Sequence, residues 1–267
     1  MADSLARGYA RLLDLALPRL RCAGYRNLQM AMPDADAKAV IDGVYRSIAR
    51  LLVAFARFPD IRRDNVSDWI EYDGFEYFQE AKRRGKGVLF ATAHMGNWEL
   101  SAYAHSLLSE PMHVIVRPLD NAAVDRVVEA RRAGSGNKLI QKKDAARAII
   151  RALHHNDAVG ILIDQNSNYE QGLFVDFFGI KACANATFAR IAAHTGAAVI
   201  PGFAVWSERR RKYILKFFPL VEITGDAQAD TQRIQASLEQ IIREYPDQWL
   251  WIHRRWKTRP PGEPALY

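Results

Sequence analysis

Hydrophobic residues along the chain follow two alternating periods, one helical and one extended. Apolar positions between residues 40 and 55 recur every 3.6 residues, which predicts an amphipathic helix that starts at Pro33-Asp34 and ends near Phe58-Pro59. The apolar run Val88–Ala93 predicts a buried strand, followed by a turn and a helical stretch through Leu108. Further strands are predicted at Met112–Val116, Ala158–Ile163, Ala197–Val205 and Tyr213–Phe218, and further helices at Ala122–Arg132, Asp144–His155 and Asp230–Glu244.

This alternation predicts an α/β fold with a central sheet covered by helices. The last two strands are separated only by Ser207–Lys212, which is typical of a hairpin and therefore predicts a mixed sheet. We expect residues 1–60 to form an N-terminal amphipathic and helical segment packed on the α/β domain of residues 61–267. That domain is expected to carry the functional site.

The first residues of the chain have the pattern of a short basic amphipathic helix. Leucine and tyrosine side chains recur at helical spacing over Leu5–Leu17, with arginines before and after Pro18. Such a helix can lie in a membrane interface or simply cap the domain, and the pattern leaves both open. No run of 18 or more uncharged apolar residues predicts a membrane span, and the N-terminus lacks the features of a signal peptide.

Composition narrows the class of protein. The chain has 267 residues, 49% of them hydrophobic and 25% charged, which is typical of a packed globular protein. Its net charge is +7, but the basic residues are dispersed and no nucleic-acid-binding motif is visible, so no nucleic-acid partner is expected. The cysteines, Cys22 and Cys183, are far apart, which favours a reducing compartment. No metal-ligand spacing and no nucleotide-binding loop occurs, so neither a metal nor a cofactor is expected.

The strongest chemical candidate is the segment His94–Glu99, which follows the predicted strand Val88–Ala93. Residues five apart point in different directions on one continuous helix, so His94 and Glu99 can meet only across a turn. Gly96 can supply that turn and Asn97 can cap the helix that follows, which places Glu99 in its first turn. A carboxylate there could fix one imidazole nitrogen and leave the other as a base. The alternative is a single structural histidine at a strand end.

Several blocks together resemble one enzyme family. The spacing His94-x4-Glu99 is similar to the H-x4-D/E motif of glycerolipid-type acyltransferases, and its surroundings resemble the bacterial lipid A biosynthesis (late) acyltransferases. The blocks are Arg26-Asn27-Leu28 with Pro33, Gly85-Lys86-Gly87-Val88, Val116-Arg117-Pro118 with Asn121, Asp164-Gln165, Asp176-Phe177-Phe178-Gly179 and Trp249–Pro260. The resemblance covers about Leu17 to Tyr267.

The resemblance implies transfer of a fatty acyl group from acyl-carrier protein to a hydroxyl of a lipid A precursor, at the cytoplasmic face of the bacterial inner membrane. It implies that His94 is the general base and that Glu99 orients its ring, with no cofactor. Most of the family carries an N-terminal transmembrane helix that this sequence does not show, so we expect peripheral membrane contact. Siblings that acylate a lysophospholipid, an aminolipid or a glycolipid share the motif, and a non-catalytic lipid-binding relative is a further alternative.

The resemblance also implies substrate-binding roles for Arg132, Asp164 and Arg117. An arginine can grip an acceptor phosphate or stabilise an oxyanion, and Asp164 at a strand end could orient it. A buried structural Arg–Asp pair would use the same residues, and Arg131 leaves the alignment of Arg132 ambiguous by one.

Two aromatic segments allow two interpretations each. Asp176–Gly179 can line an acyl groove or contribute ordinary core aromatics. The basic, tryptophan-bearing segment Trp249–Pro260 can face phosphorylated lipid at a membrane interface or form a solvated C-terminal face.

Overall fold

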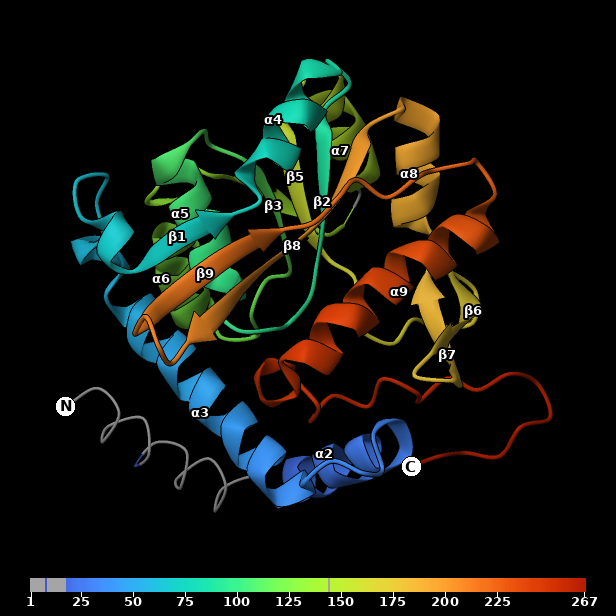
Figure 1. Cartoon of the computed structure of the whole chain (residues 1–267). Coiled ribbons are helices and arrows are strands. Elements are labelled where there is room, and N and C mark those ends of the chain that lie inside the picture. The colour runs from blue at the N-terminus through green and yellow to red at the C-terminus, as the bar shows by residue number, and fades with distance from the viewer. Residues whose placement is uncertain (1–7, 9–17, 144) are drawn as a thin grey trace.

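The computed structural model describes residues 8, 18–143 and 145–267, and the predicted helix Leu5–Leu17 lies outside them except for residue 8. Within the described residues, seven strands form one sheet in the order β1-β9-β8-β2-β5-β3-β4 (Figure 1). Their bounds are β1 Ile70–Asp73, β2 Val88–Thr92, β3 His113–Val116, β4 Lys138–Gln141, β5 Ala158–Leu162, β8 Ala198–Ser207 and β9 Lys212–Phe217.

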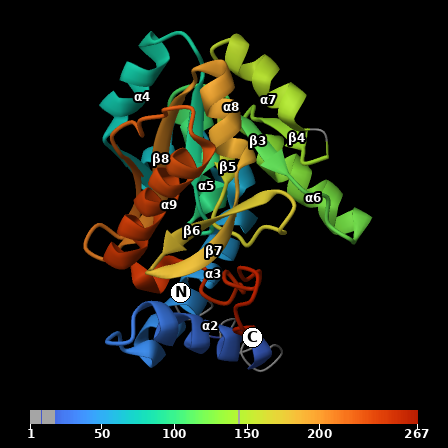
Figure 2. The same cartoon turned by 90° about the vertical axis from the view of Figure 1, so that its right-hand side faces the viewer.

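The sheet is mostly parallel, with one antiparallel pair. β2 runs parallel to both β5 and β8, whereas β8 and β9 form an antiparallel hairpin. The predicted α/β class, mixed sheet and final hairpin are therefore confirmed. A second, two-stranded antiparallel sheet of β6 (Gly172–Phe177) and β7 (Ile180–Asn185) lies beside the last helix in both views (Figures 1 and 2).

The described helices agree with the predicted ones in the middle of the chain and add others. Their bounds are α2 Pro18–Ala31, α3 Ala37–Ala56, α4 Phe75–Arg83, α5 Trp98–Leu108, α6 Ala122–Ala133, α7 Ala145–His154, α8 Thr187–Thr195 and α9 Ala227–Glu244, with short 3-10 turns at Phe58–Asp60, Val66–Asp68 and Pro246–Gln248. The prediction of a helix start at Pro33-Asp34 is wrong by a few residues. The start is Ala37, because the Asp36 side chain accepts the N–H of Ala39 at 2.9 Å and caps the helix.

Side chains of the central strand alternate between the two faces of the sheet. Val88 and Phe90 pack in one cluster with side chains of α4 and α5, whereas Leu89 and Ala91 pack in another with α7, α8 and α9. A strand covered on both faces reads as an uninterrupted apolar run, which is the pattern that predicted β2. None of the helices in the described part of the chain is both long and apolar enough to span a bilayer.

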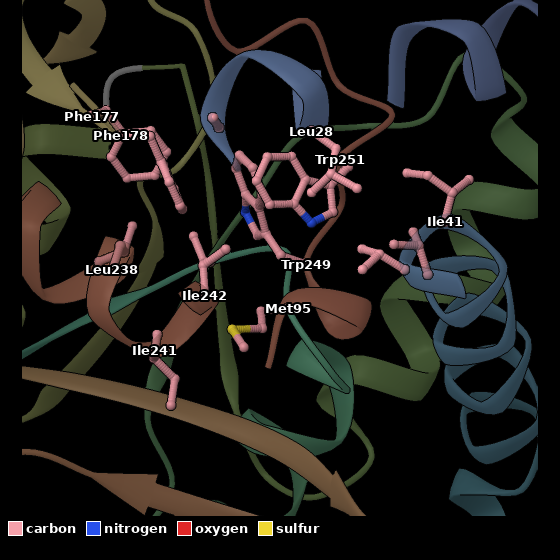
Figure 3. Close-up of a cluster of buried hydrophobic side chains, with 14 of the residues drawn as sticks. Leu28, Ile41, Met95, Phe177, Phe178, Leu238, Ile241, Ile242, Trp249 and Trp251 are labelled. Carbon is pink, nitrogen blue, oxygen red and sulfur yellow. The ribbon is translucent and has the colours of Figure 1, made fainter. Parts of the chain in front are cut away.

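A third cluster joins the two ends of the described chain. Trp249 and Trp251 pack beside Met95 and against Leu28 and Ile41 of the N-terminal helices (Figure 3). The tryptophans of the C-terminal segment are fully buried, so the interpretation of this segment as a tryptophan-bearing membrane face is wrong. The predicted division at residue 60 stays a prediction, since this cluster contains residues from both sides of it.

The ring pair of the Asp176–Gly179 block belongs to the same cluster. Phe177 and Phe178 are buried and pack edge to face, with 5.0 Å between ring centroids. Phe177 also lies 5.8 Å from the ring of Trp249. Of the two interpretations of this block, the ordinary core aromatics are therefore the one that the contacts favour.

Candidate active site

The loop after β2 has the predicted turn. Gly96 adopts φ of +56°, and a Cβ there would lie 1.9 Å from the carbonyl oxygen of Ala204 on β8. Asn97 begins α5 by accepting the Leu100 N–H at 3.0 Å, so Glu99 falls in the first helical turn. Only glycine combines this backbone conformation with so close an approach to the sheet. The loop therefore holds His94 at the carboxyl edge of the sheet.

The carboxylate bound to His94 comes from the neighbouring strand. In the parallel pairing of β2 and β5, Thr92 lies opposite Leu162, so His94 and Asp164 stand two residues beyond the same register position. Asp164 Oδ1 accepts from His94 Nδ1 at 2.8 Å, and Oδ2 accepts the backbone N–H of His94 at 3.0 Å. The Trp249 indole N–H also donates to Oδ2, at 2.9 Å. Three hydrogen-bond donors therefore hold the Asp164 carboxylate in place.

Glu99 has a different partner from the one expected. Its carboxylate binds Arg132 in a two-pronged ion pair, with Arg132 Nε at 2.9 Å and Nη2 at 2.5 Å from the two oxygens. The sequence predicts contacts of Glu99 with the His94 ring and of Asp164 with an arginine. In the structure these partners are exchanged: Asp164 binds the ring, and Glu99 binds the arginine. The reason is the strand order. β5 lies directly beside β2, so Asp164, which follows β5, contacts the imidazole that follows β2.

The ambiguity between Arg131 and Arg132 is resolved by their contacts. Arg132 alone meets Glu99, whereas Arg131 donates to the backbone carbonyl groups of Phe55 and Ala56. Arg117 is exposed after β3, and within the described residues no hydrogen bond joins its side chain to this site.

The charges around His94 hold the pKa of its ring above the ordinary value. Burial alone would lower that pKa, but the charge and hydrogen bond of Asp164 outweigh it, and the charge of Glu99 adds to the effect. Burial would raise the pKa of Asp164, yet the charge of His94 and the three hydrogen bonds keep it well below its usual range. Asp164 is therefore ionised, and the proton of the neutral imidazole lies on Nδ1.

The second ring nitrogen of His94 faces the open side of the site. His94 Nε2 lies 3.5 Å from the amide nitrogen of Gln165, at the outer limit of a hydrogen bond. Gln165 is exposed and borders a groove of about 560 Å³ that is lined by aliphatic side chains and by several amide side chains. Trp98 packs edge-on against the imidazole, with 5.2 Å between the ring centroids.

An apolar cavity is lined by Glu99 and Arg132, by other side chains of α5 and by side chains of the central strands. Aromatic and aliphatic side chains form most of its wall, including Trp98, Phe90, Met112, Leu162, Leu215 and Phe217. His105 also lines it, and burial lowers the pKa of that ring to about 3, so the imidazole is neutral. Leu162 borders both this cavity and the open groove. The cavity measures about 70 Å³, so it admits a short apolar group whose polar end stays near Glu99 and Arg132.

An imidazole with one nitrogen held by a carboxylate and the other open, beside an apolar cavity at the carboxyl edge of an α/β sheet, is typical of an enzyme that acts on a lipid-like substrate. The comparison with protein families narrows this class. The chain belongs to the bacterial lipid A biosynthesis acyltransferase family, whose model matches residues 1–258. It is therefore an acyltransferase, and membership implies a lipid acceptor.

Individual relatives match across most of their length. The lipid A biosynthesis palmitoleoyltransferase of Escherichia coli K12 is 29% identical over 260 residues, which are 94% of this chain and 83% of that protein. The lauroyltransferase of the same organism is 26% identical over 257 residues, 91% of this chain and 81% of that protein. A lipid A biosynthesis acyltransferase of Haemophilus influenzae is 23% identical over 248 residues, 91% and 77% respectively.

We expect Gly96→Ala to disturb the site loop and lower stability more than Gly196→Ala. Both glycines have positive φ, but a Cβ at Gly196 meets nothing within 4 Å, whereas at Gly96 it meets a backbone oxygen. The control substitution should cost about 1 kcal/mol for the backbone conformation alone, and the clash should add roughly 1–3 kcal/mol. Thermal unfolding measures the difference, and equal losses for the two variants would contradict it.

Asp164→Asn is expected to reverse the imidazole tautomer. Oδ2 of Asp164 accepts two N–H groups, so the asparagine oxygen should stay there and turn its NH2 group toward His94 Nδ1. The ring would then carry its proton on Nε2, where a base needs a lone pair. Acyl transfer should fall by about 10²–10⁴ while circular dichroism stays unchanged. Asp157→Asn, in the pair of His113 and Asp157 at the opposite edge of the sheet, is the matched control and should retain transfer.

The pH dependence of kcat/KM should show an acid limb above the ordinary imidazole value near 6.5. The raised pKa of His94 keeps the ring protonated to higher pH, and a protonated ring cannot accept a proton. Activity should therefore fall as the pH drops through that raised pKa. An acid limb at or below 6.5 in the wild-type enzyme would contradict this assignment.

Proposed function

We propose that the chain transfers a fatty acyl group from the thioester of acyl-carrier protein to a hydroxyl of a lipid A precursor, with His94 as the general base. The observation that carries the proposal is the His94–Asp164 contact, next to Trp98, which packs on the imidazole and lines the apolar cavity. The family membership supports the lipid acceptor. We further propose the cytoplasmic face of the bacterial inner membrane as the place of action.

The reaction needs one proton transfer in each direction at His94. Nε2 accepts the proton of the acceptor hydroxyl while its oxygen attacks the thioester carbonyl, forming the new C–O bond. The C–S bond then breaks, and the leaving thiolate takes the proton back from the imidazolium. Asp164 stabilises the imidazolium in between, as a buried carboxylate partner does. The thioester has a good leaving group, so no covalent acyl-enzyme is required.

Arg132 and Glu99 act in this proposal as a positioned pair at the mouth of the cavity. Two N–H groups of Arg132 bind Glu99, which leaves others to donate to the oxyanion that develops on the thioester carbonyl. Glu99 holds the guanidinium and contributes charge that favours the imidazolium of His94. Because Glu99 already neutralises Arg132, we assign the pair to the transition state rather than to an acceptor phosphate.

The acyl chain of the donor is assigned to the apolar cavity. Its aliphatic and aromatic walls suit a hydrocarbon chain, and Trp98 and Glu99 of its lining lie next to the proposed base. Its volume of about 70 Å³ admits only a short part of such a chain, so the cavity has to widen when the rest enters. The net charge of +7 would steer an acidic carrier protein toward the enzyme.

We expect His94→Ala to remove nearly all transfer, a loss of about 10²–10⁴ in rate. The matched control is His113→Ala, since His113 is a second half-buried histidine paired with an aspartate, at 2.9 Å, and its side chain is not among those that line the cavity. Mass spectrometry of the lipids formed from defined acyl-carrier-protein donors and purified lipid A precursor provides the assay. Substantial turnover by a folded His94→Ala enzyme would overturn the role of His94, and absence of any product with the wild type would overturn the acceptor.

Membrane contact is expected to be peripheral and salt-dependent. The helix that the sequence predicts over residues 5–17 would present its leucines as an apolar face, and the nearby arginines would attract anionic headgroups. High salt shortens the Debye length to about 3 Å at 1 M and should weaken binding to anionic vesicles. Flotation of the enzyme with and without residues 1–17 measures this. Salt-insensitive binding to neutral vesicles, or no effect of the deletion, would contradict the prediction.

A further inference from the structure

A second groove, away from His94, lies between α2 and the C-terminal segment. It measures about 410 Å³ and is lined by Arg19, Cys22, Ala23, Arg26, Arg254 and Tyr267. The C-terminus lies next to α2 in both views (Figures 1 and 2). The groove thus joins residues that are more than 200 positions apart in the sequence.

Helical spacing shapes the floor of this groove. Arg19 and Arg26 are seven residues apart on α2, which places them two turns apart on one face. Cys22 and Ala23 lie between them, and their short side chains leave the hollow that the longer arginines border. Arg254 completes the set from the opposite wall.

The walls of the groove are held together by buried hydrogen bonds. Asn27, fully buried beside Arg26, donates to the backbone oxygens of Trp251 and His253 at 2.7 Å each. Its side-chain oxygen accepts from the Tyr267 hydroxyl. The guanidinium groups of Arg26 and Arg254 stand 6.0 and 5.7 Å from the centre of the Tyr267 ring. The arginines are therefore placed on a fixed frame.

Among the described residues, the arginine side chains of the groove have no acidic side chain as a partner. Arg19, Arg26 and Arg254 are exposed and form no ion pair with any described residue, and no acidic side chain is among those that line the hollow. Some other arginines are paired with carboxylates: Arg132 binds Glu99, and Arg21 on the same helix as Arg19 and Arg26 binds Asp42 at 2.8 Å. Three guanidinium groups around one hollow repel each other and are stabilised by an anion. Guanidinium geometry matches phosphate oxygens in particular.

We infer that this groove binds the phosphate group of a membrane lipid, and that it is the phosphate-recognition site of the acceptor. The second half of the inference rests on the proposed function. Arg254 follows His253, whose ring accepts the N–H of Asn166, and Asn166 follows Gln165 beside His94. A lipid whose phosphate lies in the groove is thereby held on the frame that also carries the site. The same phosphate chemistry is offered by the headgroup of a neighbouring anionic lipid.

The kinetic test compares a phosphorylated lipid A precursor with the same lipid after enzymatic removal of its phosphates. Arg26→Gln and Arg254→Gln should each raise the acceptor KM for the phosphorylated lipid about tenfold or more, as expected for loss of a hydrogen bond to a charged group. The donor KM and the dephosphorylated acceptor should be unaffected. Arg26→Lys keeps the charge but loses the fork, so its effect should be smaller. Arg190→Gln on α8, at the opposite end of the molecule from α2, is the matched control (Figure 2).

A binding test separates the two sources of phosphate and does not require turnover. Vesicles of phosphatidylcholine with or without phosphatidic acid are floated with the same variants. Weaker flotation on phosphatidic acid with an unchanged preference for the phosphorylated acceptor would assign the groove to headgroups, whereas a lost acceptor preference would assign it to the substrate. If the wild type transfers no acyl group to lipid A precursors, the proposed function fails while the flotation result still decides the groove. Variants that match Arg190→Gln in both assays would overturn the inference.

Discussion

The arrangement of the site depends on the three hydrogen bonds that the Asp164 carboxylate accepts. The carboxylate accepts one hydrogen bond from the imidazole of His94, one from the backbone of the same residue and one from the indole of Trp249. These donors belong to the loop after β2 and to the C-terminal segment, while Asp164 itself follows β5. One buried charge therefore fixes the ring, the loop that carries it and the segment behind it. Three donors around a buried carboxylate offset the cost of removing that charge from water.

Two groups of arginines in the molecule differ in their partners: one group is bound to protein groups, and the other faces water. Arg132 is neutralised by Glu99 at the cavity, and Arg255 is fully buried and donates to the backbone oxygen of Cys183 and the side chain of Gln235. Arg255 stabilises the packing around it, and Arg132 is positioned by its carboxylate partner. The arginines of the α2 groove face water without a carboxylate. Net charge alone does not show this difference, because it appears only when each guanidinium is followed to its partner.

The periodicity of the chain predicts most of the central fold and part of the site. The strands from Val88, Ala158 and Ala198 and the cap at Asn97 follow from local patterns, and the structure confirms them. The short strand Ile70–Asp73 and the hairpin of β6 and β7 have no comparably strong signal. The pairing of Asp164 with His94 depends on which strand lies beside β2, and the order of strands in a sheet is a tertiary property. The sequence predicts both strands, but it does not predict that β5 is the parallel neighbour of β2.

The shared cluster of Trp249 and Trp251 with Leu28 and Ile41 has a consequence for the order of synthesis. A ribosome makes the His94 loop and Asp164 well before it makes Trp249, so the emerging chain lacks the indole that completes the carboxylate's set of donors. The N-terminal helices are likewise made before the tryptophans that cover them. The final assembly of the site therefore follows the synthesis of the C-terminal segment, and until then the nascent chain carries His94 beside a carboxylate that lacks its indole donor.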